Sequence, residues 1–168
     1  MLTAFRLVAM AALALPMPSS VQGEALPHPF KFFEGRTLTQ GTIKVMMSKP
    51  RRSRTLGVGT VRPDGSLSLV QQVEDQGKPP HERRWLIREV APGRYSGSMS
   101  EASGPVTIDQ VAGRYRLRLK VAGGYNVEQW LTPIAGGKSA RSQITVRKLG
   151  IVVATGEGVV TKLPSASR

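Results

Sequence analysis

The chain has 168 residues, no cysteine and only two histidines. A disulfide-stapled scaffold, a thiolate metal site and cysteine catalysis are therefore excluded, and a multi-histidine metal centre has too few ligands. Lysine and arginine together number 24 against 11 acidic residues, which gives a formal net charge of +13 and favours anionic partners. The length and the 40% hydrophobic content fit a single globular domain.

Residues 1–23 have the features of a secretory signal peptide. Arg6 is the only charged residue of this segment, and an uninterrupted apolar run over 7–15 follows it. Small residues then indicate cleavage after Gly23 or after Ala25. The run is shorter than the ~20 residues that span a bilayer, and no cysteine follows to carry a lipid. We therefore expect an exported, periplasmic protein that is soluble and carries no lipid anchor.

The remaining chain alternates apolar and polar residues with the period of β-strands. The clearest case is 114–121, where one side of the strand is cationic and the other apolar. The cationic row consists of Arg114, Arg116, Arg118 and Lys120. Because buried cations each need a partner and acids are scarce in this chain, we expect this row to face solvent. The opposite face, with Tyr115, Leu117 and Leu119, is then expected to face the interior.

Glycine- and proline-rich turns separate the strands, and the Arg-Pro-Asp-Gly sequence at 62–65 is the strongest of them. Residues 26–33 are expected to form a coil or one turn before the first strand, and 164–168 a flexible tail. About ten antiparallel strands with short loops predict an all-β fold, a closed up-and-down barrel of the lipocalin or calycin type over 30–163. Closure removes the exposed edges that an open sheet would present.

A set of short motifs occurs in a fixed order along the chain. The motifs are Phe32-Phe33-Glu34-Gly35, Gln40-Gly41, Arg83-Arg84-Trp85, Gly93-Arg94-Tyr95-Ser96-Gly97, Gly104, Gly113-Arg114-Tyr115-Arg116-Leu117, Gln129-Trp130-Leu131, Arg141 and Lys148-Leu149-Gly150. Together they resemble the domain of unknown function 3833 family of bacterial envelope proteins. The resemblance spans roughly residues 30–163.

The resemblance implies a lipocalin-like barrel with no established activity, and a connection to lipids, because some members are encoded near fatty-acid-modifying enzymes. The chain departs from the family at two points. The family usually has an aspartate before the tryptophan of its late motif, where this chain has Gln129, and many members carry a lipid-anchoring cysteine that is absent here.

No catalytic constellation is visible in the sequence. His28 and His81 fall in expected loops, Glu74 and Asp75 fall at an expected solvated strand end, and no Gly-x-Ser-x-Gly turn occurs. The sequence therefore predicts a protein that is not an enzyme and that has neither a cofactor nor a metal site.

Trp85 and Trp130 are the strongest candidates for ligand contact, because tryptophan supplies large, rigid apolar area. Tyr115, Leu117 and Leu119 would add a cavity wall, and an arginine would bind an acidic group. Arg83, Arg84 and Arg141 are the candidates for that role, and Arg84 and Arg141 are the predicted contacts. The predicted ligand is a small apolar molecule or an acidic amphiphile such as a fatty acid. The same residues would equally serve a filled core.

The basic surface leaves two kinds of partner to weigh. Nucleic-acid binding requires aromatic residues interleaved with cations, and neither the cluster at 51–54 nor the cationic row has them. We therefore expect no nucleic-acid partner. The alternative to a small-molecule carrier is a filled barrel that associates with an anionic membrane through its basic surface.

Overall fold

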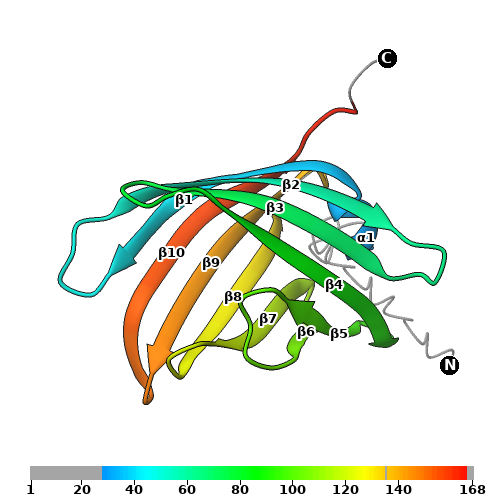
Figure 1. Cartoon of the computed structure of the whole chain (residues 1–168). Coiled ribbons are helices and arrows are strands. Elements are labelled where there is room, and N and C mark those ends of the chain that lie inside the picture. Colours follow the sequence, from blue (N-terminus) through cyan, green and yellow to red (C-terminus); the bar gives the residue numbers. More distant parts are fainter. Residues whose placement is uncertain (1–27, 135, 166–168) are drawn as a thin grey trace, which may run out of the picture.

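Figure 1 shows the computed structural model of the chain, which describes residues 28–134 and 136–165. Within these residues it is an all-β closed barrel of ten antiparallel strands, which confirms the predicted fold class. A short helix, α1 (Pro29–Phe33), precedes the strands. The strands are β1 (Gly35–Val45), β2 (Arg51–Val61), β3 (Leu67–Asp75), β4 (His81–Ala91), β5 (Arg94–Met99), β6 (Val106–Val111), β7 (Arg114–Val121), β8 (Tyr125–Ile134), β9 (Ser139–Lys148) and β10 (Ile151–Lys162). The predicted signal peptide 1–23, both of its cleavage sites and the last three residues lie outside the described residues.

Each strand pairs with the strand next to it in the sequence, and β1 pairs with β10 to close the barrel. This order follows from the short glycine-rich turns, which can only join antiparallel neighbours. The apolar side chains of the alternating pattern point inward and form one core. Its fully buried members include Phe32 and Val106, with 1% and 0% of their surface exposed.

The cationic row on β7 lies on the outside of the barrel, as the alternation predicts. Tyr115, Leu117 and Leu119 are at most 8% exposed, whereas Arg118 and Lys120 are exposed. Arg118 donates through Nη2 to Asp109 Oδ2 on the neighbouring strand β6 at 2.7 Å. The exposed cations therefore need no buried partner.

Helix α1 closes one end of the barrel. Pro29 occupies its first turn, where proline is preorganised for a helix, and His28 Nδ1 accepts a hydrogen bond from the backbone of Phe30 at 3.4 Å. Phe30 and Phe32 are 6% and 1% exposed, so the helix inserts its aromatic face into the core. The sequence predicts a coil or single turn at this point, and the structure shows that this turn is the plug of the barrel.

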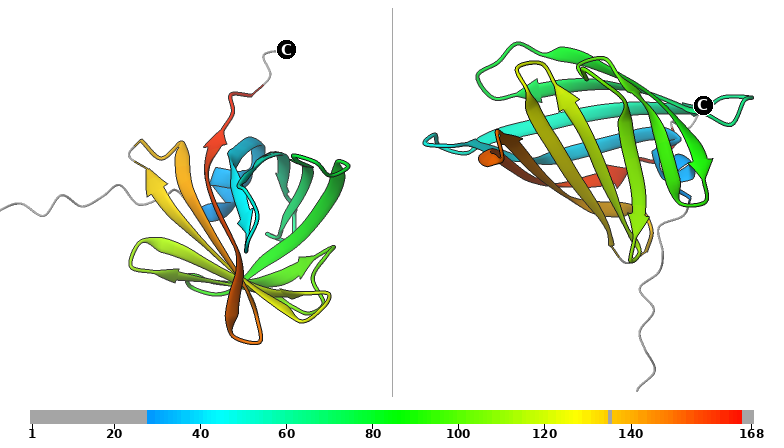
Figure 2. Two further views of the ribbon diagram at one scale, coloured as in Figure 1. Left: turned by 90° about the vertical axis from the view of Figure 1, so that its left-hand side faces the viewer. Right: turned by 90° about the horizontal axis from the view of Figure 1, so that it is seen from below.

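The strand connections divide between two ends of the barrel. The turns at 62–66, 92–93 and 112–113 lie at the α1 end. The turns at 46–50, 76–80, 100–105, 122–124 and 149–150 lie at the opposite end, here called the mouth. Figures 1 and 2 show α1 at one end and the β1–β2 and β9–β10 turns projecting from the other.

Candidate ligand-binding interior

An apolar chamber of about 100 Å³ lies inside the barrel next to α1. The lining includes Phe30 and Phe32 of α1, Leu69 of β3, Trp85 of β4, and Tyr115 and Leu117 of β7. Each of these strand residues occupies an inward position of its alternating pattern. The chamber is smaller than a ~150 Å³ apolar cavity known to hold benzene, so it accommodates a compact apolar group.

A second chamber of about 140 Å³ lies between the apolar chamber and the mouth, and its mixed lining is more polar than that of the first, so it is here called the polar chamber. Ser53, Asp75, Arg83 and Ser142 contribute to it. The two chambers share four lining residues, so they are adjacent compartments of one interior. The shared residues are Thr39, Gln71, Trp85 and Gln129.

Two hydrogen bonds organise the boundary between the chambers. Trp85 donates through Nε1 to Gln71 Oε1 at 2.7 Å, and Gln129 donates through Nε2 to Ser142 Oγ at 2.8 Å. A half-buried indole N–H usually needs such a partner, and the bond fixes the ring orientation. The boundary is therefore built from side chains with polar tips and apolar bodies.

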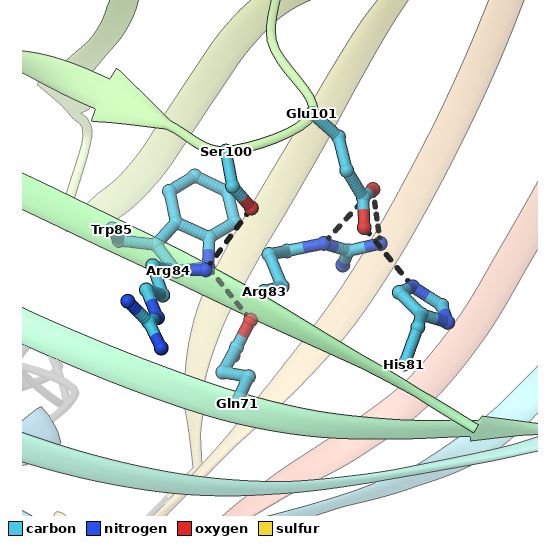
Figure 3. Close-up of polar contacts among 7 residues, drawn as sticks. All are labelled: Gln71, His81, Arg83, Arg84, Trp85, Ser100 and Glu101. Atoms are coloured by element: carbon cyan, nitrogen blue, oxygen red, sulfur yellow. Dashed lines mark hydrogen bonds and ion pairs between the residues drawn. The ribbon is translucent and has the colours of Figure 1, made fainter.

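The mouth side of the interior carries a charged cluster (Figure 3). Arg83 donates through Nε and Nη2 to Glu101 Oε2 at 3.2 and 2.9 Å. His81 Nε2 lies 3.0 Å from the other oxygen of the same carboxylate. Glu101 therefore bridges His81 and Arg83 of β4, and the charge of Arg83 is already balanced.

Asp75 brings a second carboxylate to the polar chamber. Its Oδ1 is buried and has no hydrogen-bond partner among the described residues. Buried carboxylate oxygens are nearly always hydrogen-bonded, so an unpartnered one points to a missing donor. The neighbouring Glu74 instead faces solvent and pairs with Arg54 at 3.2 Å. The sequence predicts one solvated strand end for both acids, and the structure separates them between two faces.

Two tyrosines line the apolar side of the interior, and burial governs their titration. Burial, with the nearby Glu89 carboxylate, raises the pKa of Tyr95 to about 12 from an ordinary value of 10.0. Burial also raises the pKa of Tyr115. Both phenols are therefore neutral at physiological pH, and the deep chamber contains no charge from them.

Three of the predicted contact residues line the apolar chamber: Trp85, Tyr115 and Leu117. Leu119 shares the inward face of β7 and is buried in the core, but it lines neither chamber. Of the expected wall on β7, the half that lies toward α1 thus borders the chamber.

The other three predicted contacts lie on the outer face of the barrel. Arg84 has a side chain 74% exposed, points away from Glu101 in Figure 3, and pairs with the exposed Glu82 at 2.5 Å. Arg141 is also exposed. Trp130 stands beside its cross-strand partner Arg116, and the guanidinium of Arg114 lies 4.4 Å from its ring centroid.

The placement of these three residues follows from strand alternation. Gln129 and Leu131 line the interior, so Trp130 between them must face outward. Trp85 faces inward, so its neighbour Arg84 faces outward and Arg83 points inward. The prediction that Arg84, Arg141 and Trp130 face a common cavity is therefore wrong, and the inward arginine is Arg83.

The histidines also differ from the exposed loop residues that the sequence predicts. His81 begins β4 and contacts Glu101, whereas His28 caps α1 and its Nε2 lies 3.5 Å from Glu89. Among the described residues, the polar partners of the two rings are carboxylates and, for His28, one backbone N–H, so neither ring is paired with a serine hydroxyl. Across residues 28–134 and 136–165, no group of three or more His, Cys, Asp or Glu residues could hold a metal.

Comparison with known proteins supports the fold. The S-type phycobiliprotein lyase CPES from Guillardia theta superposes with a TM-score of 0.63 over 81% of this chain and 91% of that chain. The sequence identity is 8%, so the likeness concerns the fold alone. No protein-family model and no curated protein sequence matches the chain. Among the helices of the described residues, none has the length and apolar character needed to cross a bilayer.

Proposed function

We propose that this protein is an exported, non-catalytic carrier of a small amphiphilic molecule, which it binds inside the barrel. The observation that carries the proposal is the division of the interior into an apolar chamber and an adjoining polar chamber. An amphiphile has the same two-part chemistry. Its apolar group would contact Trp85, Tyr115 and Leu117, and its polar end would face the mouth.

The polar end is proposed to donate a hydrogen bond. Asp75 Oδ1 is a buried acceptor in need of a donor, and Arg83 is already paired with Glu101. A hydroxyl or ammonium group satisfies Asp75, whereas a carboxylate would add a third negative charge beside Asp75 and Glu101. The proposal thus replaces the acidic end predicted from Arg84 and Arg141, because both of these arginines face solvent.

Export to the periplasm and membership of the domain of unknown function 3833 family are part of the same proposal. The N-terminal charge, apolar run and small residues support export, and the ordered motifs over roughly 30–163 support the family. N-terminal sequencing of the secreted chain should begin at Glu24 or Leu26. A mature protein that begins at Met1 would refute export.

The fold neighbour is a lyase, so an enzyme is the competing class of function. The binding role is preferred because, among the described residues, neither histidine has a serine or threonine hydroxyl as a hydrogen-bond partner, so no nucleophile is paired with a base. In a carrier, the bound molecule leaves unchanged, which mass spectrometry of the recovered molecule can check.

The test is a fluorescence titration in a Trp130→Phe background, so that Trp85 at the chamber boundary is the only emitter. Hexanol, hexylamine and hexanoate share one short chain and differ in the polar end. We expect saturable changes with hexanol and hexylamine and weaker binding of hexanoate. Asp75→Asn should weaken hexylamine by about tenfold, since hydrogen bonds to charged groups contribute ~1.5–3 kcal/mol.

The matched control is Glu74→Gln, which removes the same charge from the next residue on the opposite face of β3. Its affinities for the three probes should stay within about twofold of those of the Trp130→Phe protein, because the exposed Glu74–Arg54 ion pair contributes little free energy. A titration without saturation for all three probes would refute the carrier function. Equal affinities for the three probes that do not change in Asp75→Asn would refute the proposed orientation of the polar end.

A further inference from the structure

Two hairpin tips at the mouth expose apolar side chains to solvent. Met47 in the β1–β2 turn is 99% exposed, and Leu149 in the β9–β10 turn is 91% exposed. They are the two most exposed large hydrophobic residues of the described chain. Four of the remaining exposed ones flank these two turns, namely Val45, Met46, Ile151 and Val152. Clustering of this kind marks an interaction surface, whereas single exposed apolar residues do not.

The two tips belong to adjacent hairpins, because β1 and β10 are paired strands and β10 continues past the end of β1 to the β9–β10 turn. Val45 is the register partner of Ala154, and the backbone N–H of Met46 donates to the carbonyl of Val153 at 2.8 Å. Figures 1 and 2 show both hairpins projecting from the end of the barrel opposite α1. In Figure 1 the β1–β2 turn lies at the left and the β9–β10 turn at the lower left, so the two tips are separate points of the mouth.

The geometry of the two turns does not explain why bulky apolar residues occupy their tips. Met47 and Leu149 have φ values of 62° and 50°, in the left-handed region that favours glycine, asparagine or aspartate. A bulky apolar side chain is unfavourable there both for the backbone and for its exposure to water. The identity of these two residues therefore points to a contact outside the chain.

Cations surround the apolar tips. Lys44, Lys49, Arg51, Arg52 and Lys148 are all exposed on the two hairpins. The segments 44–52 and 147–153 contain no acidic residue. An apolar tip with a cationic rim matches an anionic lipid surface, in which acyl chains lie beneath negatively charged headgroups.

We propose that the mouth of the barrel docks on an anionic lipid bilayer through the β1–β2 and β9–β10 hairpins. Met47 and Leu149 enter the interfacial layer, and the surrounding lysines and arginines contact lipid phosphates. The polar chamber lies on the mouth side of the interior, so the docked barrel turns its binding site toward the bilayer. This inference goes beyond the carrier function and locates membrane contact at the hairpin tips, whereas the sequence suggested only a generally basic surface.

The experiment is vesicle flotation of the exported protein, with vesicles of phosphatidylcholine alone or with phosphatidylglycerol added. We expect binding that requires phosphatidylglycerol and weakens at high salt. The double variant Met47→Ser/Leu149→Ser should lose binding by about tenfold or more, because it removes the inserted apolar area. The matched control Val58→Ser/Val159→Ser removes exposed apolar area from the barrel wall and should bind as the parent does.

A second pair of variants separates local charge from net charge. Lys49→Gln/Arg52→Gln changes the cationic rim of the tips, and Arg62→Gln/Arg88→Gln makes the same charge change away from the hairpin tips. Only the first pair should weaken vesicle binding strongly. Equal losses of vesicle binding in both pairs would overturn the proposal. A protein that binds neither kind of vesicle would also overturn it, even if the tips were found to bind another protein.

Circular dichroism of each variant establishes that the barrel is intact, which is expected for the hairpin and wall variants because their substituted residues are exposed. Flotation of Asp75→Asn separates this inference from the carrier function. That variant should bind vesicles normally even where it binds hexylamine poorly. Vesicle binding that disappears together with ligand binding would contradict a separate docking surface.

Discussion

Truncation of Phe32 to alanine tests whether α1 is an integral plug of the barrel. Phe32 is 1% exposed, and its ring lies edge-on to Phe33 at 5.0 Å between centroids. Buried Phe→Ala changes usually cost ~3–5 kcal/mol. Because part of this ring borders the apolar chamber, it has fewer contacts to lose, and we expect about 3 kcal/mol. The enlarged chamber should at the same time bind hexanol or a longer alcohol more tightly.

Urea unfolding followed by tryptophan fluorescence measures this loss, and Phe33→Ala is the matched control. Phe33 is only partly buried, so its loss should be about 1–2 kcal/mol. A Phe32→Ala variant destabilised by less than ~1 kcal/mol would show that α1 does not plug the barrel. Lower alcohol affinity in that variant would show that the chamber is not the binding site.

Three further predictions concern the wall and the core. Arg118→Ser should change the free energy of unfolding by less than ~1 kcal/mol despite its 2.7 Å bond to Asp109, because the pair is exposed, and a larger loss in urea unfolding would place the row inside. Gly158→Ala should destabilise the barrel by at least ~1–3 kcal/mol, because its Cβ would meet the Gln40 carbonyl at 2.6 Å, whereas Gly104→Ala, with open space, should be neutral by thermal unfolding. The pKa of Tyr95 is about 12 in the folded protein against 10.0 in the unfolded chain, so the folded state holds this proton more tightly. The resulting stability is fully present below pH 10 and is lost as the pH rises toward 12. A urea midpoint that stays constant across this range would refute the burial of Tyr95.

The strands and their order could be predicted from the sequence, because both depend on local features of the chain. Alternation in 114–121 determines which side chains face inward, and short turns determine which strands are neighbours. The barrel then follows from the need to close the sheet. The burial of α1 could not be predicted, because a five-residue helix has no periodic signal and owes its position to tertiary contacts.

Only part of the interior lining was predicted. The errors arose where the inward and outward positions of a strand were not assigned. Three adjacent residues, Arg83, Arg84 and Trp85, share one motif, but only the first and third share a face. Applying the alternation of β4 from Trp85 backward would have selected Arg83. The pairing of Arg83 with Glu101 was beyond such reasoning, because Glu101 comes from a loop whose position depends on the whole barrel.

The carrier function is tested most directly by native mass spectrometry of the protein after incubation with a total bacterial lipid extract. We predict a noncovalent complex of one small amphiphile per chain, released unchanged on denaturation and carrying a hydroxyl or amino group. Trp85→Ala should reduce this complex, whereas Trp130→Phe, on the outer face, should retain it. A chain that stays free of any bound molecule under these conditions would contradict the account.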